Sequence, residues 1–201
     1  MSIDLTGLPS LEWTHGPGGA EHGDDRLVLT AAAGTDWSND ATRDGAPAEP
    51  LSTSLSFAPG HGDFLLSARV EVNPPRTTFD AAVLTVWADD RHWAKLCFEQ
   101  SPQGEAMVVS VVTDEFSDDA NGAPVEGSAV WLRIARVGSA FAFHSSLDGA
   151  FWRFARLFRL DLHGDPRVGF MAQAPNGDRA EAVFSHVSFE RRTLKDLRNG
   201  E

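Results

Sequence analysis

The stretch Phe64-Leu65-Leu66-Ser67-Ala68-Arg69-Val70-Glu71-Val72 has an apolar side chain at every even-numbered position. The odd positions from 67 to 71 hold serine, arginine and glutamate. Because successive side chains of a strand point to opposite faces, this alternation predicts a β-strand with one buried face. A helix would instead bury every third or fourth residue.

The same two-residue period recurs along the chain, between turns rich in Gly, Pro, Asn and Asp. Short alternating blocks separated by such turns are typical of antiparallel β structure. So many strands in one chain predict an all-β fold, a two-sheet antiparallel β-sandwich. The other predicted strands are 26–31, 51–57, 81–87, 93–99, 106–113, 130–137, 141–145, 168–173 and 182–189.

Length and composition predict a single domain over residues 1–201. The chain has 201 residues, 42% of them hydrophobic, which is enough for one well-formed core. Residues 36–50 are polar and lack a pattern, so we expect a long loop there. For the charged C-terminal tail, 191–201, we expect a short helix or a frayed end.

The net charge of −12 repels phosphate backbones, so nucleic acid is not an expected partner. No membrane association is expected either, since no apolar run approaches the roughly 18 residues that a span needs. The first residues lack the basic start and apolar stretch of a secretory signal. With Cys97 as the single cysteine no intramolecular disulfide can form, and a cytoplasmic location is the simplest interpretation.

The sequence contains none of the usual signatures of hydrolase nucleophiles, phosphate loops, dinucleotide binding or zinc proteases. The seven histidines are scattered, and neither a metal nor a cofactor is expected. The acidic stretch from Asp114 to Asp119, extending to Gly122, offers oxygen ligands that calcium prefers, but its spacing is not that of an EF-hand. We expect a solvated loop there.

The predicted strand 93–99 carries the most distinctive chemistry. Alternation puts Trp93, Lys95 and Glu99 on one face, with the apolar residues between them on the other. An aromatic ring, an ammonium and a carboxylate suit a sugar, which presents a C–H face and hydroxyls. A partly exposed strand carrying a weak Lys–Glu pair would give the same pattern.

The chain also resembles the uncharacterised YesU-like family (domain of unknown function 1349). The similarity runs from about residue 64 to 189, and Trp93, Lys95, Glu99 and Arg133 match the family pattern, whereas only Asp80 remains of its Tyr-Asp-Gln motif. The motifs that carry it are Phe79-Asp80-Ala81-Ala82-Val83-Leu84, Asp90-Arg91-His92-Trp93-Ala94-Lys95, Phe98-Glu99, Ser110-Val111-Val112-Thr113, Ser117-Asp118, Leu132-Arg133, Ser146-Leu147-Asp148-Gly149 with Trp152, and Val168-Gly169-Phe170.

This resemblance implies a jelly-roll sandwich of the concanavalin A-like lectin and glucanase type, with a concave sheet face that often holds carbohydrate. The paired-acid motif E-x-D-x-x-E of the glucanases is absent. A retaining glucanase mechanism is therefore not expected.

Three functional hypotheses follow. The first is a lectin-like protein that holds a sugar or oligosaccharide on the concave face. Its expected ligand-binding residues are Trp93 for stacking and Lys95, Glu99, Arg133, Asp80, His144 and Gln173 for polar contacts.

The second hypothesis is an enzyme acting on a sugar or sugar-derived metabolite, with Glu99 or Asp80 as general base and Arg133 binding an anionic group. The third is a non-catalytic interaction or oligomerisation module, in which exposed tryptophans form a homo-oligomer interface. Most of Trp87, Trp131 and Trp152 are nevertheless expected in the core.

Overall fold

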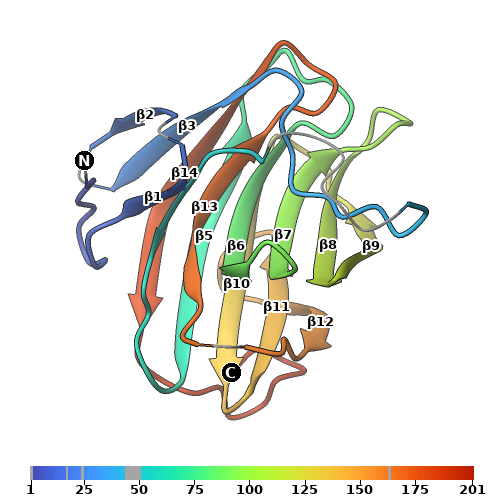
Figure 1. The fold of residues 1–201 in the computed structure, drawn as a ribbon. Coiled ribbons are helices and arrows are strands. Elements are labelled where there is room, and N and C mark those ends of the chain that lie inside the picture. The colour runs from blue at the N-terminus through green and yellow to red at the C-terminus, as the bar shows by residue number, and fades with distance from the viewer. Residues whose placement is uncertain (1, 17, 24, 44–50, 163) are drawn as a thin grey trace.

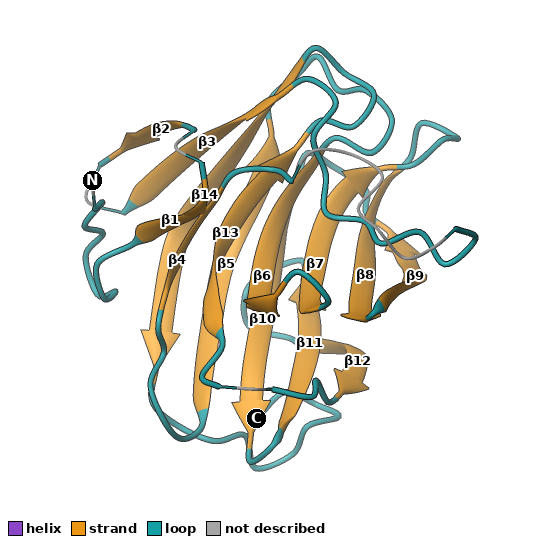
Figure 2. Ribbon diagram, in the orientation of Figure 1, coloured by secondary structure: helices purple, strands orange, loops and turns teal. Residues whose placement is uncertain are grey.

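Two antiparallel sheets of seven strands each form the fold in the computed structural model (Figure 1). The structure describes residues 2–16, 18–23, 25–43, 51–162 and 164–201. Within them Figure 2 shows strands and loops and no helix. The predicted all-β, two-sheet sandwich is confirmed.

The two sheets are named here the first and the second sheet. In spatial order the first contains β1 (Glu12–His15), β4 (Ser54–Phe57), β13 (Arg167–Gln173), β6 (Ala81–Asp89), β7 (His92–Gln100), β8 (Ala106–Asp114) and β9 (Phe116–Pro124). The second contains β12 (Arg153–Phe158), β11 (Ala140–Ser146), β10 (Ala129–Val137), β5 (Phe64–Val72), β14 (Arg179–Glu190), β3 (Arg26–Ala32) and β2 (Gly19–His22).

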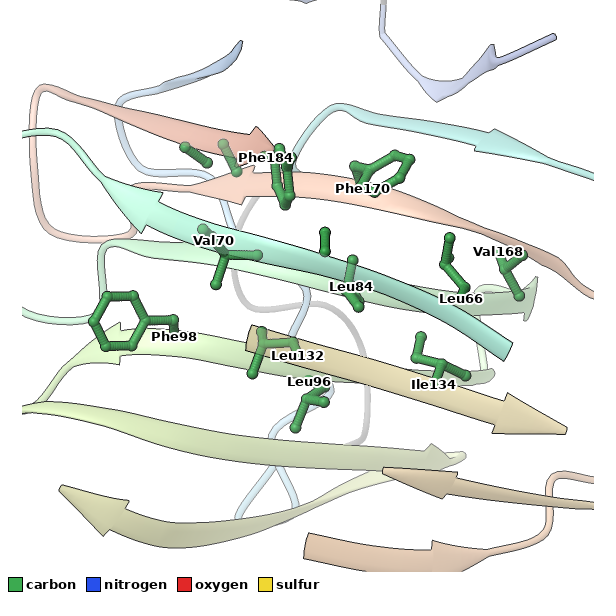
Figure 3. Close-up of a cluster of buried hydrophobic side chains, with 14 of the residues drawn as sticks. Leu66, Val70, Leu84, Leu96, Phe98, Leu132, Ile134, Val168, Phe170 and Phe184 are labelled. Atoms are coloured by element: carbon green, nitrogen blue, oxygen red, sulfur yellow. The ribbon is translucent and has the colours of Figure 1, made fainter. Parts of the chain in front are cut away.

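The main core lies between the sheets. The even-numbered side chains of β5 point into it, as the alternation predicts, and meet apolar side chains of β6, β7 and β13. Figure 3 shows Val70 and Leu66 of β5 close to Leu84 of β6. Every labelled side chain in that view is buried and apolar, so this interface holds the two sheets together.

The outer face of the first sheet carries a second apolar cluster. Trp87 and Trp93 lie there, and Trp37, from the segment that follows β3, covers them. The Trp37 indole Nε1 donates to the Ser52 carbonyl at 3.0 Å. The described part of the expected loop, 36–43, runs beside β7 and β8 toward β9 (Figure 1), while 44–50 fall outside the described residues.

The C-terminal tail packs on the outer face of the second sheet. Leu194 is buried against Leu65, Ala135 and Ala142. The tail continues through a turn over 197–200 and is neither the short helix nor the frayed end that we expected. The Gly200 amide closes this turn by donating to the Asp196 carbonyl at 3.0 Å.

Strand β9 corrects the expectation of an acidic loop. Residues 116–124 pair antiparallel with β8, from Asp114 opposite Phe116 to Met107 opposite Pro124. The strand lies at the edge of the sheet and is mostly exposed, so it shows no apolar alternation. Polar, charged composition is how edge strands avoid pairing with other molecules.

Candidate functional site

A cleft of about 280 Å³ opens on the outer face of the first sheet. Strands β7, β8 and β9 supply one side, and the segments after β3 and after β13 supply the other. Its polar lining comprises Asp36, Ser38, Lys95, Glu99, Asp119, Asn121, Gln173 and Asn176, and its apolar lining Trp37, Phe79, Val109, Val111 and Pro175.

Sheet register brings these side chains together. Lys95 stands opposite Val111, and Val111 stands opposite Asp119, so these three residues form one row across β7, β8 and β9. Glu99 lies four residues along β7 from Lys95 and therefore on the same face. The cleft is built on strands, which hold its polar groups at fixed spacing.

Lys95 is buried, with 3% of its surface exposed, and is held by two acceptors. Its Nζ donates to Asp36 Oδ1 at 2.7 Å and to Gln173 Oε1 at 3.0 Å. Burial by itself would lower the pKa of Lys95, but the nearby Asp36 and other acidic groups outweigh it and raise that pKa. Lys95 is therefore a fixed cation within the network.

Gln173 connects Lys95 to Glu99. Its Nε2 donates to the Phe79 carbonyl at 2.9 Å and to Glu99 Oε2 at 3.3 Å. The Glu99 side chain is nearly buried, and loss of water raises the pKa of its carboxyl to about 7, helped by the negative charges of Asp36 and Asp119. Glu99 thus exchanges a proton near neutral pH, as a general acid or base must.

Asp119 stands at the mouth of the cleft. Its residue is exposed on edge strand β9, yet partial burial of the carboxyl and the charge of Asp36 raise its pKa. Within the described residues, its carboxylate has no ion-pair or hydrogen-bond partner. Asp119 and Glu99 therefore give the cleft two carboxyls whose charge is incompletely compensated.

Trp93 is on the face of β7 that we predicted, but it is fully buried. The Trp37 ring covers it at a centroid distance of 5.7 Å. The prediction that Trp93 stacks on a sugar is therefore wrong for this structure. Trp37 lies 56 positions earlier in the chain, so the pattern of the strand itself does not reveal that Trp93 is covered.

Arg133 and His144 lie on the other side of the molecule, on the outer face of the second sheet. Arg133 Nη2 donates to the Gly200 carbonyl at 2.8 Å, and its guanidinium lies 4.0 Å from the centre of the Trp152 ring. His144 Nε2 is 2.8 Å from the Leu197 carbonyl. The prediction that Arg133 and His144 join Lys95 in one groove is wrong, because alternation fixes a face but not a sheet.

Asp80 does not line the cleft. It is fully buried in the turn before β6, where its Oδ2 accepts from the Thr77 amide at 2.8 Å. Burial raises its pKa, as it does for Glu99. Asp80 holds the turn that carries Phe79, so its geometry supports a structural role better than that of a general base.

Asp36, Asp119, Asn121 and Phe79 are cleft residues that sequence reasoning missed as site residues. Asp36 lies in the patternless segment, and Asp119 lies in the stretch that was interpreted as a solvated loop. The sequence signal that could have identified Asp119 as a site residue is the group of acidic side chains from Asp114 to Asp119. Among the residues that the structure describes, no group of three or more His, Cys, Asp or Glu side chains is arranged to hold a metal ion.

A larger hollow, of about 400 Å³, lies between the turn at 73–77 and the start of β14. Its charged groups bind one another: Asn73 Nδ2 donates to Glu181 at 3.0 Å, and Arg179 pairs with the same carboxylate. None of the predicted site residues lines it. The smaller cleft is therefore the better candidate site.

The two antiparallel sheets match a β-sandwich of the concanavalin A-like type. The chain belongs to the family described as "Protein of unknown function (DUF1349)", whose pattern it matches over residues 13–192. The suspected YesU-like membership is thereby confirmed. No curated protein matches the chain. In the described part of the chain, no helix is both long and apolar enough to cross a membrane.

Among solved structures, the chain is similar to a functionally unknown protein from Saccharomyces cerevisiae, with 23% identity, a TM-score of 0.81 and coverage of 92% of this chain and 97% of that one. It is also similar to an engineered GH43 glycoside hydrolase with endo-xylanase and exo-arabinofuranosidase activity, at 17% identity and a TM-score of 0.69. That match covers 90% of this chain but 38% of the hydrolase.

The alginate lyase AlyC3, solved with dimannuronate, is 13% identical with a TM-score of 0.53, over 84% of this chain and 76% of the lyase. At these identities the similarities show a shared fold. Several proteins with this fold are carbohydrate-active, whereas the family itself has no known function.

Proposed function

We propose that this protein binds carbohydrate in the cleft lined by Lys95, Glu99 and Gln173. The observation that carries the proposal is the linked network of an ammonium, an amide and a carboxylate at the base of an open cleft. An amide can both donate to and accept from hydroxyls, and a carboxylate accepts from them. The network holds these groups in place before a ligand arrives. The carbohydrate-active proteins that share the fold agree with this proposal.

Phe79 takes the role of apolar contact that we first gave to Trp93. It lines the cleft beside Asn176 and Gln173, and its backbone has a φ of 70°, which is rare for a bulky residue. Its amide donates to the Gln100 carbonyl at 2.7 Å, and its carbonyl accepts from Gln173. A strained backbone that its surroundings hold in place is found preferentially at ligand sites.

Calorimetry with a panel of oligosaccharides tests the proposal. We expect Phe79→Ala and Gln173→Ala to lose most of the affinity of the wild-type protein for its ligand. Phe151→Ala is the matched control, because Phe151 is 65% exposed in the loop before β12 and does not line the cleft. Absence of binding to every sugar, or equal binding by the cleft variants, would contradict the proposal.

A second candidate function is catalysis, with Glu99 as general acid or base. The specific observation in its favour is the pKa of about 7 for a nearly buried carboxyl inside the cleft, close to the value at which proton transfer is most efficient. Once a substrate is known, Glu99→Gln should lower turnover far more than it weakens binding. Unchanged turnover would exclude Glu99 from the mechanism.

An interface built from exposed tryptophans has no support, since all six tryptophans are buried or half-buried. Trp87 belongs to the outer cluster rather than the main core, and Trp131 and Trp152 lie half-buried on the outer face of the second sheet. A homo-oligomer formed by other surfaces stays a prediction, to be measured by light scattering.

A further inference from the structure

We propose that the ligand of this cleft carries a positive charge, as an amino sugar does, and that the cleft rejects sugars bearing carboxylates or phosphates. This inference rests on the proposed function and specifies its class of ligand. It follows from the charges in the cleft and from which of them already have partners.

The cleft contains three carboxyl groups and one ammonium. Asp36, Glu99 and Asp119 line it together with Lys95. The ammonium binds Asp36 directly, at 2.7 Å, and so neutralises that one carboxylate. Glu99 and Asp119 remain. Asp119 adds to the negative potential that a ligand meets on entering, and Glu99 does so in its ionised form, which a bound cation favours.

Lys95 cannot serve an anionic ligand. Its side chain is 4% exposed, and two of its three N–H donors are occupied by Asp36 and Gln173. Binding an anion through Lys95 would require breaking the Asp36 pair and leaving that carboxylate unpaired in a partly buried position. Removing one partner of a buried ion pair is strongly unfavourable.

No other described cation lines the cleft. The Arg76 guanidinium, whose charge acts on Glu99, lies 4.8 Å from the centre of the Phe98 ring and not among the lining residues. Arg156 pairs with Asp118 at 3.0 Å, one residue from Asp119 and on the opposite face of β9. Arg133, which we first expected to bind an anion here, lies on the second sheet.

Glu99 has unused acceptor capacity directed into the cleft. The residue is 8% exposed, and only its Oε2 accepts a hydrogen bond among the described residues, from Gln173 at 3.3 Å. Asp119 accepts none from any described residue. An ammonium group supplies three donors together with the missing charge, so it satisfies both carboxylates better than a hydroxyl does.

The pKa shifts of the two carboxyls agree with this geometry. The pKa values of Glu99 and Asp119 are both raised, mainly because their carboxylates lose water. The charges of Asp36 and Asp119 add to the rise for Glu99, and those of Asp36 and Asp118 add to it for Asp119. A cation bound between them would reverse that effect. A divalent metal is a poorer occupant, since the described residues provide no set of three ligands for it.

The test compares three ligands on the same protein by calorimetry: β-1,4-linked glucosamine oligomers, their N-acetylated counterparts and uronic acid oligomers. The first two differ only in amine against acetamide. Since a hydrogen bond to a charged group contributes roughly 1.5–3 kcal/mol, we expect the amine to bind about tenfold or more tightly. We expect no measurable binding of the uronate.

Two pairs of variants test which carboxyl groups cause the preference for the amine. Glu99→Gln should weaken binding of the amine more than binding of the acetamide and so remove most of the preference for the amine. Glu105→Gln, an exposed change of the same charge outside the cleft, should leave that preference as in the wild type. Asp119→Asn and its neighbour Asp118→Asn form the second pair. Because Asp119 is exposed, its variant tests the inference even if Glu99→Gln fails to fold.

The outcomes separate this inference from the proposed function. Equal binding of amine and acetamide, or binding of the uronate, would overturn the inference and leave carbohydrate binding standing. Failure of all three ligands would count against carbohydrate binding itself. Loss of amine binding in EDTA would show that a metal ion bridges the carboxylates and would also overturn the inference.

Discussion

At the scale of single residues, Lys95 shows how a charge is accommodated inside this sandwich. An isolated buried ammonium is strongly unfavourable, so it needs a partner close by and acceptors for its protons. Asp36 and Gln173 provide these from two segments that are distant in sequence. The pair therefore also ties the segment after β3 to the outer face of the first sheet.

Replacing Lys95 by Met should lower the free energy of unfolding by about 3–5 kcal/mol, because it leaves Asp36 buried without its counter-ion. Urea unfolding measures the loss. The double variant Lys95→Met with Asp36→Asn should recover a large part of it, since no unpaired charge remains. A single variant as stable as the wild type would show that the pair is open to water.

At the scale of elements, each outer sheet face is covered by a segment without regular structure. The segment after β3 covers the first sheet with Trp37, and the tail covers the second sheet through its carbonyls. The tail approaches closely at Gly200, which has a φ of 78°. A Cβ there would collide with the Arg133 guanidinium and lie 2.8 Å from Trp152 Cβ.

Gly200→Ala should therefore be more destabilising than an ordinary glycine substitution. The left-handed conformation alone costs a Cβ-bearing residue roughly 1–2 kcal/mol. Gly138→Ala is the matched control, because Gly138 has a φ of 59° and nothing within 4 Å of an added Cβ. Urea unfolding should show a larger loss for Gly200→Ala. Equal losses would mean that the tail moves aside without penalty.

The strands that the sequence predicts best are those with one apolar face. The predicted bounds of β5 match the structure at both ends, and β7 and β8 extend their predictions by one residue at one or both ends. Four strands were missed, β1, β2, β9 and β12, which are the four edge strands and contain no fully buried residue. Exposure removes the alternation on which the prediction depends.

The candidate site, like the strands, could be predicted only where the sequence shows alternation. Alternation placed Lys95 and Glu99 on one face, and Gln173 was named as a ligand residue. Contacts between residues distant in sequence decide which sheet a strand joins. They also decide where an irregular segment lies. For that reason the sequence does not reveal Asp36 as a site residue or show that Arg133 lies in the other sheet.

At the scale of the whole molecule, two buried titratable groups, Glu99 and His144, lie on opposite outer faces. They have opposite effects on how stability depends on pH. Burial raises the pKa of Glu99 from 4.5 to about 7 in the first sheet. In the second sheet, burial lowers the pKa of His144 from 6.5 to about 4, against the hydrogen bond from its ring to Leu197 and with help from the charge of Arg133. Each group is thus kept neutral by the fold over a similar pH range.

Their effects on stability have opposite signs. Between about pH 4.5 and 7 the folded protein holds a proton on Glu99 that the unfolded chain releases, so this contribution to stability falls as pH rises. Between about pH 4 and 6.5 the unfolded chain protonates His144 and the folded protein does not, so that contribution rises with pH. Each pKa shift corresponds to about 3 kcal/mol of stability, and the two contributions largely cancel.

Replacing one of the two groups should reveal how the other makes the free energy of unfolding depend on pH. Relative to the wild type, Glu99→Gln should gain stability as pH rises from about 4.5 to about 7, because the variant no longer loses the contribution of the protonated carboxyl. His144→Gln should show the reverse trend from about 4 to about 6.5, relative to the same reference. Urea unfolding across this range measures both differences, and Glu105→Gln serves as the control for a change of charge at the surface. Differences that do not vary with pH would show that neither group has a shifted pKa in the folded protein, and the Glu99 result would then also remove the electrostatic support for an acid–base role in the cleft.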